Sequence, residues 1–144
     1  MEIRSASFKD TLAIRDLLAQ LGYRIEYPLL MTQVSLLMSN PDHQLLVAEK
    51  DKLVVAFCSV HFMPQLANDG HLAVINHFVV DEKVRGEGVG KALESHVTAA
   101  AWNRKCDRVQ LHCHSWRSQA HSFYKHQGYQ EYPTYFSKRL VHAE

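Results

Sequence analysis

The fold is decided by residues 72–93, which read LAVINHFVVDEKVRGEGVGKAL. An apolar strand over 72–80 leads through a short charged turn into a glycine-spaced loop, and that loop opens a helix. Glycines at positions 86, 88 and 90 adopt backbone conformations that other residues resist and let the backbone approach a ligand closely. Amides at a helix N-terminus favour phosphate, and Arg85 and Lys91 flank the loop with positive charge. The stretch therefore predicts a phosphate-bearing cofactor at a strand-to-helix junction.

The composition favours one soluble domain. A length of 144 residues suits a single core, so we expect one domain over 1–144. A net charge of +1 gives no electrostatic reason for nucleic acid or an anionic membrane to be the main partner. The N-terminus lacks a signal-peptide core, and no apolar run approaches the roughly 20 residues that span a bilayer. The odd cysteine count (Cys58, Cys106 and Cys113) indicates free thiols, so we expect a cytoplasmic protein.

Hydrophobic periodicity predicts a mixed α/β chain. Helices are expected from Ser7 or Asp10 to Leu21, over 29–39, after Gly88 and over 119–127. Strands are expected over 3–6, 45–49, 53–62, 72–80 and 108–114, with a closing pair over 129–131 and 135–139. The expected order is β-α-α-β-β-β-α-β-α-β-β.

A second motif lies near the end of the chain, where residues 120–129 read AHSFYKHQGY. Together with the loop over 85–90 and the element order, it resembles the GNAT superfamily of N-acetyltransferases. The loop is similar to that family's Arg/Gln-x-x-Gly-x-Gly/Ala acyl-CoA motif, and residues 120–129 are similar to its Ala-x-x-Phe-Tyr-x-x-x-Gly-Tyr/Phe motif. The resemblance covers nearly the whole chain. It implies a GNAT-like acyl-CoA N-acyltransferase fold, with a central, mixed, mostly antiparallel sheet flanked by helices.

The resemblance also implies acetyl-CoA as the cosubstrate. The pyrophosphate would be held, with Arg85 alongside, by backbone N–H groups of Gly86, Glu87, Gly88, Val89, Gly90 and Lys91. The pantetheine arm would lie along Phe78, Val79 and Val80, and would pair with the first and last of them like an added strand. A dinucleotide fold is the rival for such a loop, but the glycine spacing does not give Gly-x-Gly-x-x-Gly.

Acetyl transfer from a thioester to an amine makes three chemical demands. The amine must be neutral, although a free alkylamine has a pKa of about 10.4. The developing oxyanion needs a placed donor, for which a backbone N–H near Phe78 or Val79 is the candidate. The departing thiolate needs a proton, and Tyr124 matches the family's acid. The alternative for Tyr124 is a core tyrosine on an amphipathic helix.

The general base is left open by the sequence. Many relatives carry a carboxylate near the positions of Asn76 and His77, and this chain has none there. His77 is a candidate because imidazole titrates near neutral pH, and the alternative is a neutral histidine hydrogen-bonded in a buried strand. Glu26, His61 and Asp69 are further candidates. A water chain without a dedicated base is another.

The acceptor side carries fewer signals. The resemblance implies that the aromatic loop with Tyr23, Glu26 and Tyr27 borders the acceptor site. Arg117 stands where many relatives have asparagine, as in a subset resembling aminoalkylphosphonate and similar small-amine acetyltransferases. Arg117 would contact CoA or an anionic part of the substrate. The equally good alternative is that it is a solvated arginine at the start of a helix, with no role in binding.

The histidine-rich stretch His112-Cys113-His114, with His121 nearby, suggests a zinc site at first sight. Strand alternation turns Cys113 away from its two neighbours, so we predict no metal.

The sequence thus predicts an acetyl-CoA-dependent N-acetyltransferase. It would act on a primary amine of a small molecule or peptide by direct attack in a ternary complex, because no motif marks a cysteine as acyl carrier. The alternative is a catalytically silent acyl-CoA-binding regulatory module. The resemblance also implies a homodimer.

Overall fold

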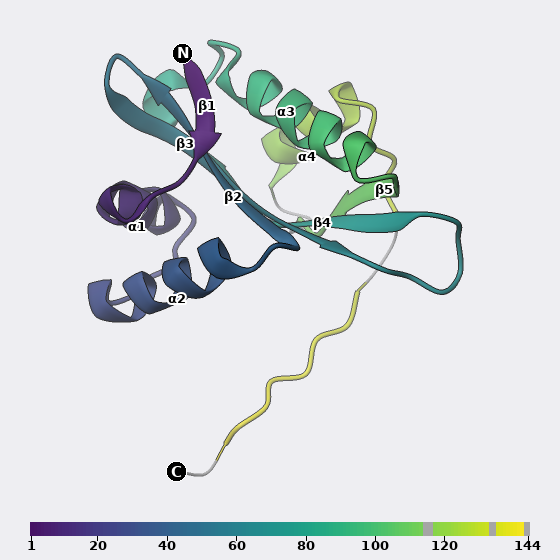
Figure 1. Cartoon of the computed structure of the whole chain (residues 1–144). Helices are drawn as coiled ribbons and strands as arrows, with labels where there is room; N and C mark the ends of the chain where they lie inside the picture. The colour runs from purple at the N-terminus through teal and green to yellow at the C-terminus, as the bar shows by residue number, and fades with distance from the viewer. Residues whose placement is uncertain (114–116, 133–134, 143–144) are drawn as a thin grey trace. The chain divides into compact units, whose positions relative to one another are not determined.

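The computed structural model describes residues 1–113, 117–132 and 135–142 of the chain. These residues form two compact units, the first over 1–111 and the second beginning at His112. The first unit holds a five-stranded sheet in the order β1-β2-β3-β4-β5 (Figure 1). Its strands are β1 (Glu2–Ser5), β2 (His43–Lys50), β3 (Leu53–Met63), β4 (His71–Val80) and β5 (Cys106–Leu111). All neighbouring pairs are antiparallel except β4 with β5, which confirms the mixed, mostly antiparallel sheet.

The helices of the first unit cover both faces of this sheet. They are α1 (Thr11–Gln20), α2 (Tyr27–Ser39) and α3 (Val89–Asn103), with 3-10 turns η1 (Phe8–Asp10) and η2 (Glu82–Val84). Helices α1 and α2 lie together on one face, and α3 lies on the other (Figure 1). Each face has its own apolar core: Ile14, Leu17 and Val34 meet Phe57 and Val79 on the first, and Leu93 and Val97 meet Ile75 on the second. We call these the α1/α2 face and the α3 face.

Local chemistry explains where several elements end. Gly22 closes α1 with a φ of +90°, and its amide bonds back to Ala19 O at 3.0 Å, as a C-terminal glycine does. Asp51 and Lys52 both take positive φ (52° and 66°) and form the two-residue turn of the β2–β3 hairpin. Helix α2 begins at Tyr27, two residues before the predicted start, because Pro28 fits the first turn of a helix.

A charged cluster ties β1 to the start of α1. Arg4 donates to both carboxylate oxygens of Asp10, at 2.8 and 3.0 Å, and to Glu49 at 3.0 Å. Asp10 also accepts from the Ser7 amide at 2.8 Å. The hydrogen bond from Arg4 lowers the pKa of the Asp10 carboxyl. The first strand is thereby fixed to the edge of the α1/α2 face.

Strand β4 contains a bulge at Asn76. Ser59 pairs with His77 and Val60 pairs with Ile75, so Asn76 is one residue extra on β4. Side chains of a regular strand alternate between faces, and the extra residue resets that alternation. Ala73 and Ile75 pack on the α3 face before the bulge, and Phe78 and Val80 pack there after it. His77 and Val79 are therefore turned to the α1/α2 face.

The parallel ladder between β4 and β5 covers only the first half of β4. It runs from His71↔Cys106 to Ile75↔Leu111, whereas the ladder with β3 continues to Val80. The ladder is tightly fixed at its start, where Gly70 has a φ of +88° and a Cβ on it would stand 2.7 Å from Lys105 O. The second half of β4 thus extends beyond the ladder with β5.

The second unit contains helix α4 (Ser118–His126), closed by Gly128 with a φ of +93°. The closing strands predicted over 129–131 and 135–139 are not formed: the described residues 129–132 and 135–142 contain no strand, and Phe136 is 93% exposed. Aromatic residues raise the β-propensity of a segment, but a strand also needs a neighbour to take its backbone hydrogen bonds. The predicted element order is therefore correct up to α4 and wrong after it.

Candidate functional site

The junction between β4 and α3 is held in place by the end of α1. Asp81 Oδ1 accepts from the Lys83 amide at 3.0 Å and from Gln20 Nε2 at 3.3 Å. The Glu82 amide donates to Gln20 Oε1 at 3.1 Å. The Gln20 amide group thus binds both sides of the turn, and the chain enters the glycine loop from a fixed position.

The glycine loop needs glycine at two of its three positions. Gly86 and Gly88 have φ values of +83° and +85°, where side chains are strained, and a Cβ on either would meet no atom within 4 Å. Gly90 lies in the first turn of α3 without a positive φ. Gly88 is the N-cap residue of α3 and brings no capping side chain. The first helical amides, from Gly88 to Lys91, therefore lack the usual side-chain acceptor and suit an anion.

Charged side chains surround this loop. Arg85 and Lys91 are exposed on either side of it, as predicted. Glu87 forms an ion pair with Lys50, from the end of β2, and that hydrogen bond raises the pKa of the Lys50 ammonium. The side chain of Val89 is 2% exposed in the α3-face core, so only its backbone can contact a cofactor. The sequence did not identify Lys50 as a site residue, because its place beside a hairpin turn does not reveal that it pairs with Glu87.

The side chains in the second half of β4 are covered on both faces of the sheet. Val79 is fully covered by the α1/α2-face core, and Phe78 and Val80 are partly buried on the α3 face. All three lie past Ile75, where the ladder with β5 ends. This position fits the expected added strand, since peptide-like groups bind a strand through its backbone.

His77 lies on the opposite side of the same strand segment and meets Tyr23. The two ring centroids are 5.4 Å apart and the planes are at 84°, an edge-to-face contact. Burial lowers the pKa of the His77 imidazole, which keeps the ring neutral at neutral pH with a nitrogen able to accept a proton. The structure thus brings together one predicted acceptor-site residue and the predicted base.

A buried polar pair stands beside His77 on the same face. His43 Nε2 and Ser59 Oγ are 2.7 Å apart, and Ser59 is the cross-strand neighbour of His77. Burial, with the nearby His61 ring adding to it, lowers the pKa of His43 to about 4. Sequence reasoning missed both residues: a histidine starting one strand and a serine inside the next become neighbours only through the strand register, which single-strand patterns do not reveal.

The other predicted acceptor-site residues and the further candidates for the base are spread out. Glu26 is exposed at the N-cap of α2, Tyr27 is the exposed first residue of that helix, and Asp69 is exposed in the loop before β4. His61 lies beside His43, with ring centroids 6.2 Å apart. The described contacts link Tyr23 to His77, and they do not link Glu26, Tyr27 or Asp69 to it.

The second unit carries the remaining two predicted residues. Tyr124 on α4 is buried, with the Phe123 and Tyr129 rings 5.2 and 5.6 Å from its own. Arg117 occupies the N-cap position of α4, and its Nη1 lies 3.9 Å from Cys113 Sγ. Tyr124 is thus held rigidly within its unit, as either a catalytic or a core tyrosine would be.

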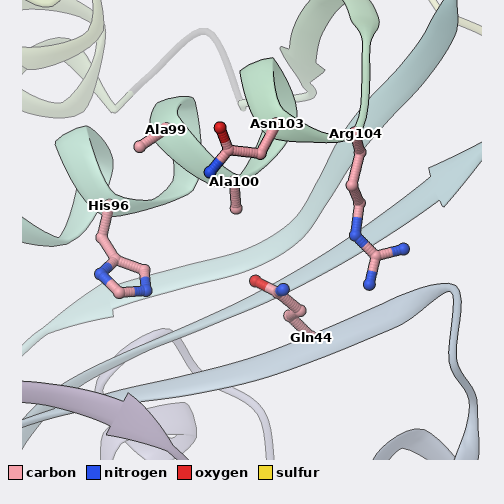
Figure 2. Close-up of a pocket in the computed structure, with 6 residues that line it drawn as sticks. All are labelled: Gln44, His96, Ala99, Ala100, Asn103 and Arg104. Atoms are coloured by element: carbon pink, nitrogen blue, oxygen red, sulfur yellow. The ribbon is translucent and has the colours of Figure 1, made fainter.

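A pocket of about 310 Å³ lies on the α3 face and contains none of the predicted residues. It is lined by Gln44, His96, Ala99, Ala100, Asn103 and Arg104. Figure 2 shows Gln44 pointing from β2 toward α3. Arg104 is already engaged, since it donates to Pro41 O at 2.9 Å and lies 4.2 Å over the Phe62 ring. This pocket is separate from the β4–α3 junction.

In residues 1–113, 117–132 and 135–142, no group of three or more His, Cys, Asp or Glu side chains could hold a metal ion. His114, of the considered His-Cys-His stretch, lies outside the described residues. No helix among them is both long and apolar enough to cross a bilayer.

A family model described as the acetyltransferase (GNAT) family matches residues 11–129. The chain belongs to the GNAT acetyltransferase family. The matched range includes both the glycine loop and the motif around Tyr124, the two stretches that suggested the family.

Several solved structures share this fold. The chain is similar to a transcriptional regulator from Bacillus halodurans C-125, with 23% identity, a TM-score of 0.89, and 96% of this chain and 99% of that one covered. It is similar to glucosamine-6-phosphate N-acetyltransferase from Arabidopsis thaliana, with 23% identity, a TM-score of 0.81, and 97% and 98% covered. It is also similar to ribosomal-protein-alanine N-acetyltransferase from Brucella melitensis biovar Abortus 2308, with 18% identity, a TM-score of 0.78, and 97% and 100% covered.

Proposed function

We propose that this GNAT protein is an acetyl-CoA-dependent N-acetyltransferase that acts on a primary amine of a small molecule or peptide. The observation that carries the proposal is the uncapped N-terminus of α3 behind Gly86 and Gly88, whose backbone has room for a ligand. A cradle of backbone amides with adjacent cationic side chains fits a pyrophosphate. Acetyl-CoA, when bound, supplies the activated acetyl group as a thioester.

The residues proposed to hold the cosubstrate come from the glycine loop, the second half of β4, the end of β2 and the start of α4. Backbone amides from Gly86 to Lys91 bind the pyrophosphate, and Arg85, Lys91 and Lys50 add positive charge. The backbone of Phe78, Val79 and Val80 is proposed to pair with the extended pantetheine arm. The end of the β4–β5 ladder at Ile75 supports this assignment. Arg117 is proposed to contact the cosubstrate or an anionic part of the acceptor.

The chemical steps are assigned to three groups of this chain. His77 takes a proton from the amine as its nitrogen attacks the acetyl carbon, and the lowered pKa of the imidazole keeps it ready to accept. A backbone N–H near Phe78 or Val79 stabilises the negative charge that develops on the carbonyl oxygen. Tyr124 donates its phenolic proton to the departing sulfur when the carbon–sulfur bond breaks.

The acceptor is proposed to approach along the α1/α2 side, past Tyr23, which touches the base. Glu26 and Tyr27 are proposed to border its path, since both are exposed at the start of α2. A homodimer is part of the same proposal, and light scattering of the purified chain tests it directly.

The deciding experiment measures thiol release from acetyl-CoA across a panel of amines. The native chain is compared with Tyr124→Phe and with Tyr132→Phe, a matched control at a 72% exposed tyrosine. General acid catalysis contributes about 10²- to 10⁴-fold, so kcat should fall by about that factor in Tyr124→Phe and remain unchanged in the control.

Two outcomes would count against the assignments. Equal turnover in the native chain and Tyr124→Phe excludes that tyrosine as the acid. Binding of CoA without turnover of any amine favours the silent acyl-CoA-binding module, for which the missing carboxylate beside His77 is the supporting observation.

A further inference from the structure

The C-terminal end of α1 contacts β4 and the turn after it at two places. Gln20, in the last turn of the helix, donates from Nε2 to Asp81 Oδ1 at 3.3 Å and accepts from the Glu82 amide at 3.1 Å. Just beyond the helix, the Tyr23 ring meets the His77 ring edge to face. His77 lies within β4 and Asp81 directly follows it. The end of α1 therefore contacts both ends of the segment proposed to bind the arm of the cosubstrate.

A tight turn joins these two contacts. Gly22 has a φ of +90°, its amide donates to Ala19 O at 3.0 Å, and the Tyr23 amide donates to Leu18 O at 3.1 Å. This pair of hydrogen bonds is the Schellman motif, in which a left-handed residue turns the chain directly after a helix. Gln20 lies in the helical turn that the motif closes. The backbone positions of Gln20 and Tyr23 are thus fixed relative to each other.

The turn after β4 is attached to the sheet independently of Gln20. The Asp81 amide donates to Val55 O on β3 at 2.8 Å, and Asp81 Oδ1 accepts from the Lys83 amide at 3.0 Å. The Val84 amide donates to Asp81 O at 3.0 Å. These bonds do not involve α1. The turn therefore has its own anchor, and the Gln20 amide group ties the end of α1 to it.

Apolar packing alone holds this end of the helix weakly. Leu18 is the last buried residue of α1, and residues 19–24 are exposed apart from the half-buried Leu21. The Tyr23 side chain is 49% exposed. A segment with little buried apolar surface opens easily. The two hydrogen bonds of Gln20 therefore matter for the position of the Tyr23 ring.

We propose that Gln20 is a positioning residue for the acceptor side, because it ties the end of α1 to the turn after β4 and so holds the Tyr23 ring against His77. The inference rests on the proposed function, in which His77 is the base and the acceptor passes Tyr23. A base must lie within about 2.6–3.2 Å of the group whose proton it takes, so a ring beside the base limits where the amine can lie. The anchor of this contact is the turn that leads into the glycine loop.

The first test measures the contact itself, as the nuclear Overhauser cross-peak between the Tyr23 and His77 rings in the ligand-free protein. Gln20→Met removes both hydrogen bonds and keeps a good helix former of similar length. The cross-peak should weaken by about twofold or more, since a released ring spends part of its time away from His77. Gln33→Met, at an exposed glutamine of α2, is the matched control and should leave the cross-peak unchanged. An unchanged cross-peak in a folded Gln20→Met chain overturns the proposal.

A second variant breaks the link at the turn and leaves the Gln20 side chain in place. Gly22→Val forces the chain to abandon its φ of +90°, which a β-branched residue does not adopt, while the added Cβ meets no atom within 4 Å. The cross-peak between Tyr23 and His77 should weaken as it does in Gln20→Met. A cross-peak of native strength would show that the ring keeps its place without the helix end, and would overturn the proposal.

Kinetics separate this role from a merely structural one. In Gln20→Met, kcat/KM for the amine should fall about fivefold, while CoA affinity stays within about twofold because the turn keeps its own bonds to β3. A loss confined to CoA affinity would mean that Gln20 serves only the glycine loop, which contradicts the proposal. If the native chain acetylates no amine, the proposed function fails, while the ring contact still decides this inference.

Discussion

The two sides of the β4–α3 region are built in different ways. The proposed cofactor side consists mainly of backbone: two glycines with positive φ, the first amides of α3 and the second half of β4. The proposed acceptor side consists of side chains from separate strands and a loop, with His77 between Tyr23 and Ser59. The bulge at Asn76 places His77 on the α1/α2 face, whereas regular alternation from Ile75 would have placed it on the α3 face.

This difference predicts which substitutions each side tolerates. A backbone cradle depends on conformation, so it is sensitive to substitutions that alter φ and insensitive to most side chains nearby. A side-chain row depends on identity and register, so a single replacement alters the chemistry without altering the fold. The predictions below use this contrast, because a change on one side should leave the other side's property intact.

The largest effect is expected from His77→Gln. Removal of a general base lowers kcat by about 10²-fold or more, while CoA affinity should stay within about twofold because the glycine loop is untouched. Steady-state kinetics and calorimetric CoA titration measure the two properties. A pH–rate profile identical to that of the native chain would remove His77 as the base.

The next effect is expected from Gly88→Val. A left-handed conformation costs a non-glycine residue about 1–2 kcal/mol, and a β-branched one more, so the loop should abandon its φ of +85°. CoA affinity should then fall about tenfold or more. Gly90→Ala is the matched control, because Gly90 is helical and alanine favours a helix. Native CoA affinity in a folded Gly88→Val chain would show that the loop has another use.

A smaller effect concerns stability at low pH. The folded-state pKa of His43 is about 4, below its ordinary value of 6.5, so the unfolded chain binds more protons between these values. Stability should therefore fall as the pH drops from 6.5 to 4, by at most about tenfold in the folding equilibrium per pH unit. The lowered pKa of His77 acts with the same sign.

Urea unfolding of the native chain and His43→Gln across this range measures the His43 contribution. Between pH 6.5 and 4, the free energy of unfolding of the variant should depend much less on pH than that of the native chain. Below this range the variant should still lose stability as Asp10, whose carboxyl has a lowered pKa, becomes protonated. Equal slopes in both chains would mean that His43 is not the titrating group.

The smallest effect is expected from Lys50→Gln. It leaves Glu87 without its cationic partner beside the proposed pyrophosphate site, so CoA affinity should fall a few fold, and less at high salt. Glu87→Gln is the counterpart and should raise affinity slightly. Stability should barely change in either, since exposed ion pairs contribute little. A salt-independent loss in Lys50→Gln would argue against an electrostatic role.

The conformation of the glycine loop and the buried face of α3 could be predicted from the sequence because their signals are local. The positive φ of Gly86 and Gly88 follows from their place between a strand and a helix, and the helix face through Leu93 and Val97 follows from simple periodicity. These features depend on residues close together in the chain. Gly90 fits the same pattern without needing glycine's conformational freedom.

The acceptor side could not be predicted in the same way. The pairing of His43 with Ser59, and of Ser59 with His77, depends on the register of three strands and on one bulged residue. A one-residue difference in register would turn each side chain to the other face. The predicted strands after α4 were wrong for a related reason: the propensity of 135–139 is local, but the partner that a strand requires is not.

Gly70 fixes the point at which the loop before β4 returns to the sheet. Residues 64–69 are mostly exposed, and the chain returns to the sheet through Gly70, whose missing side chain admits Lys105 O and whose neighbour His71 donates to that oxygen at 3.1 Å. Because this return point is fixed by a close backbone contact, a change of length or sequence within 64–69 should leave the pairing of β4 with β3 and β5 in place.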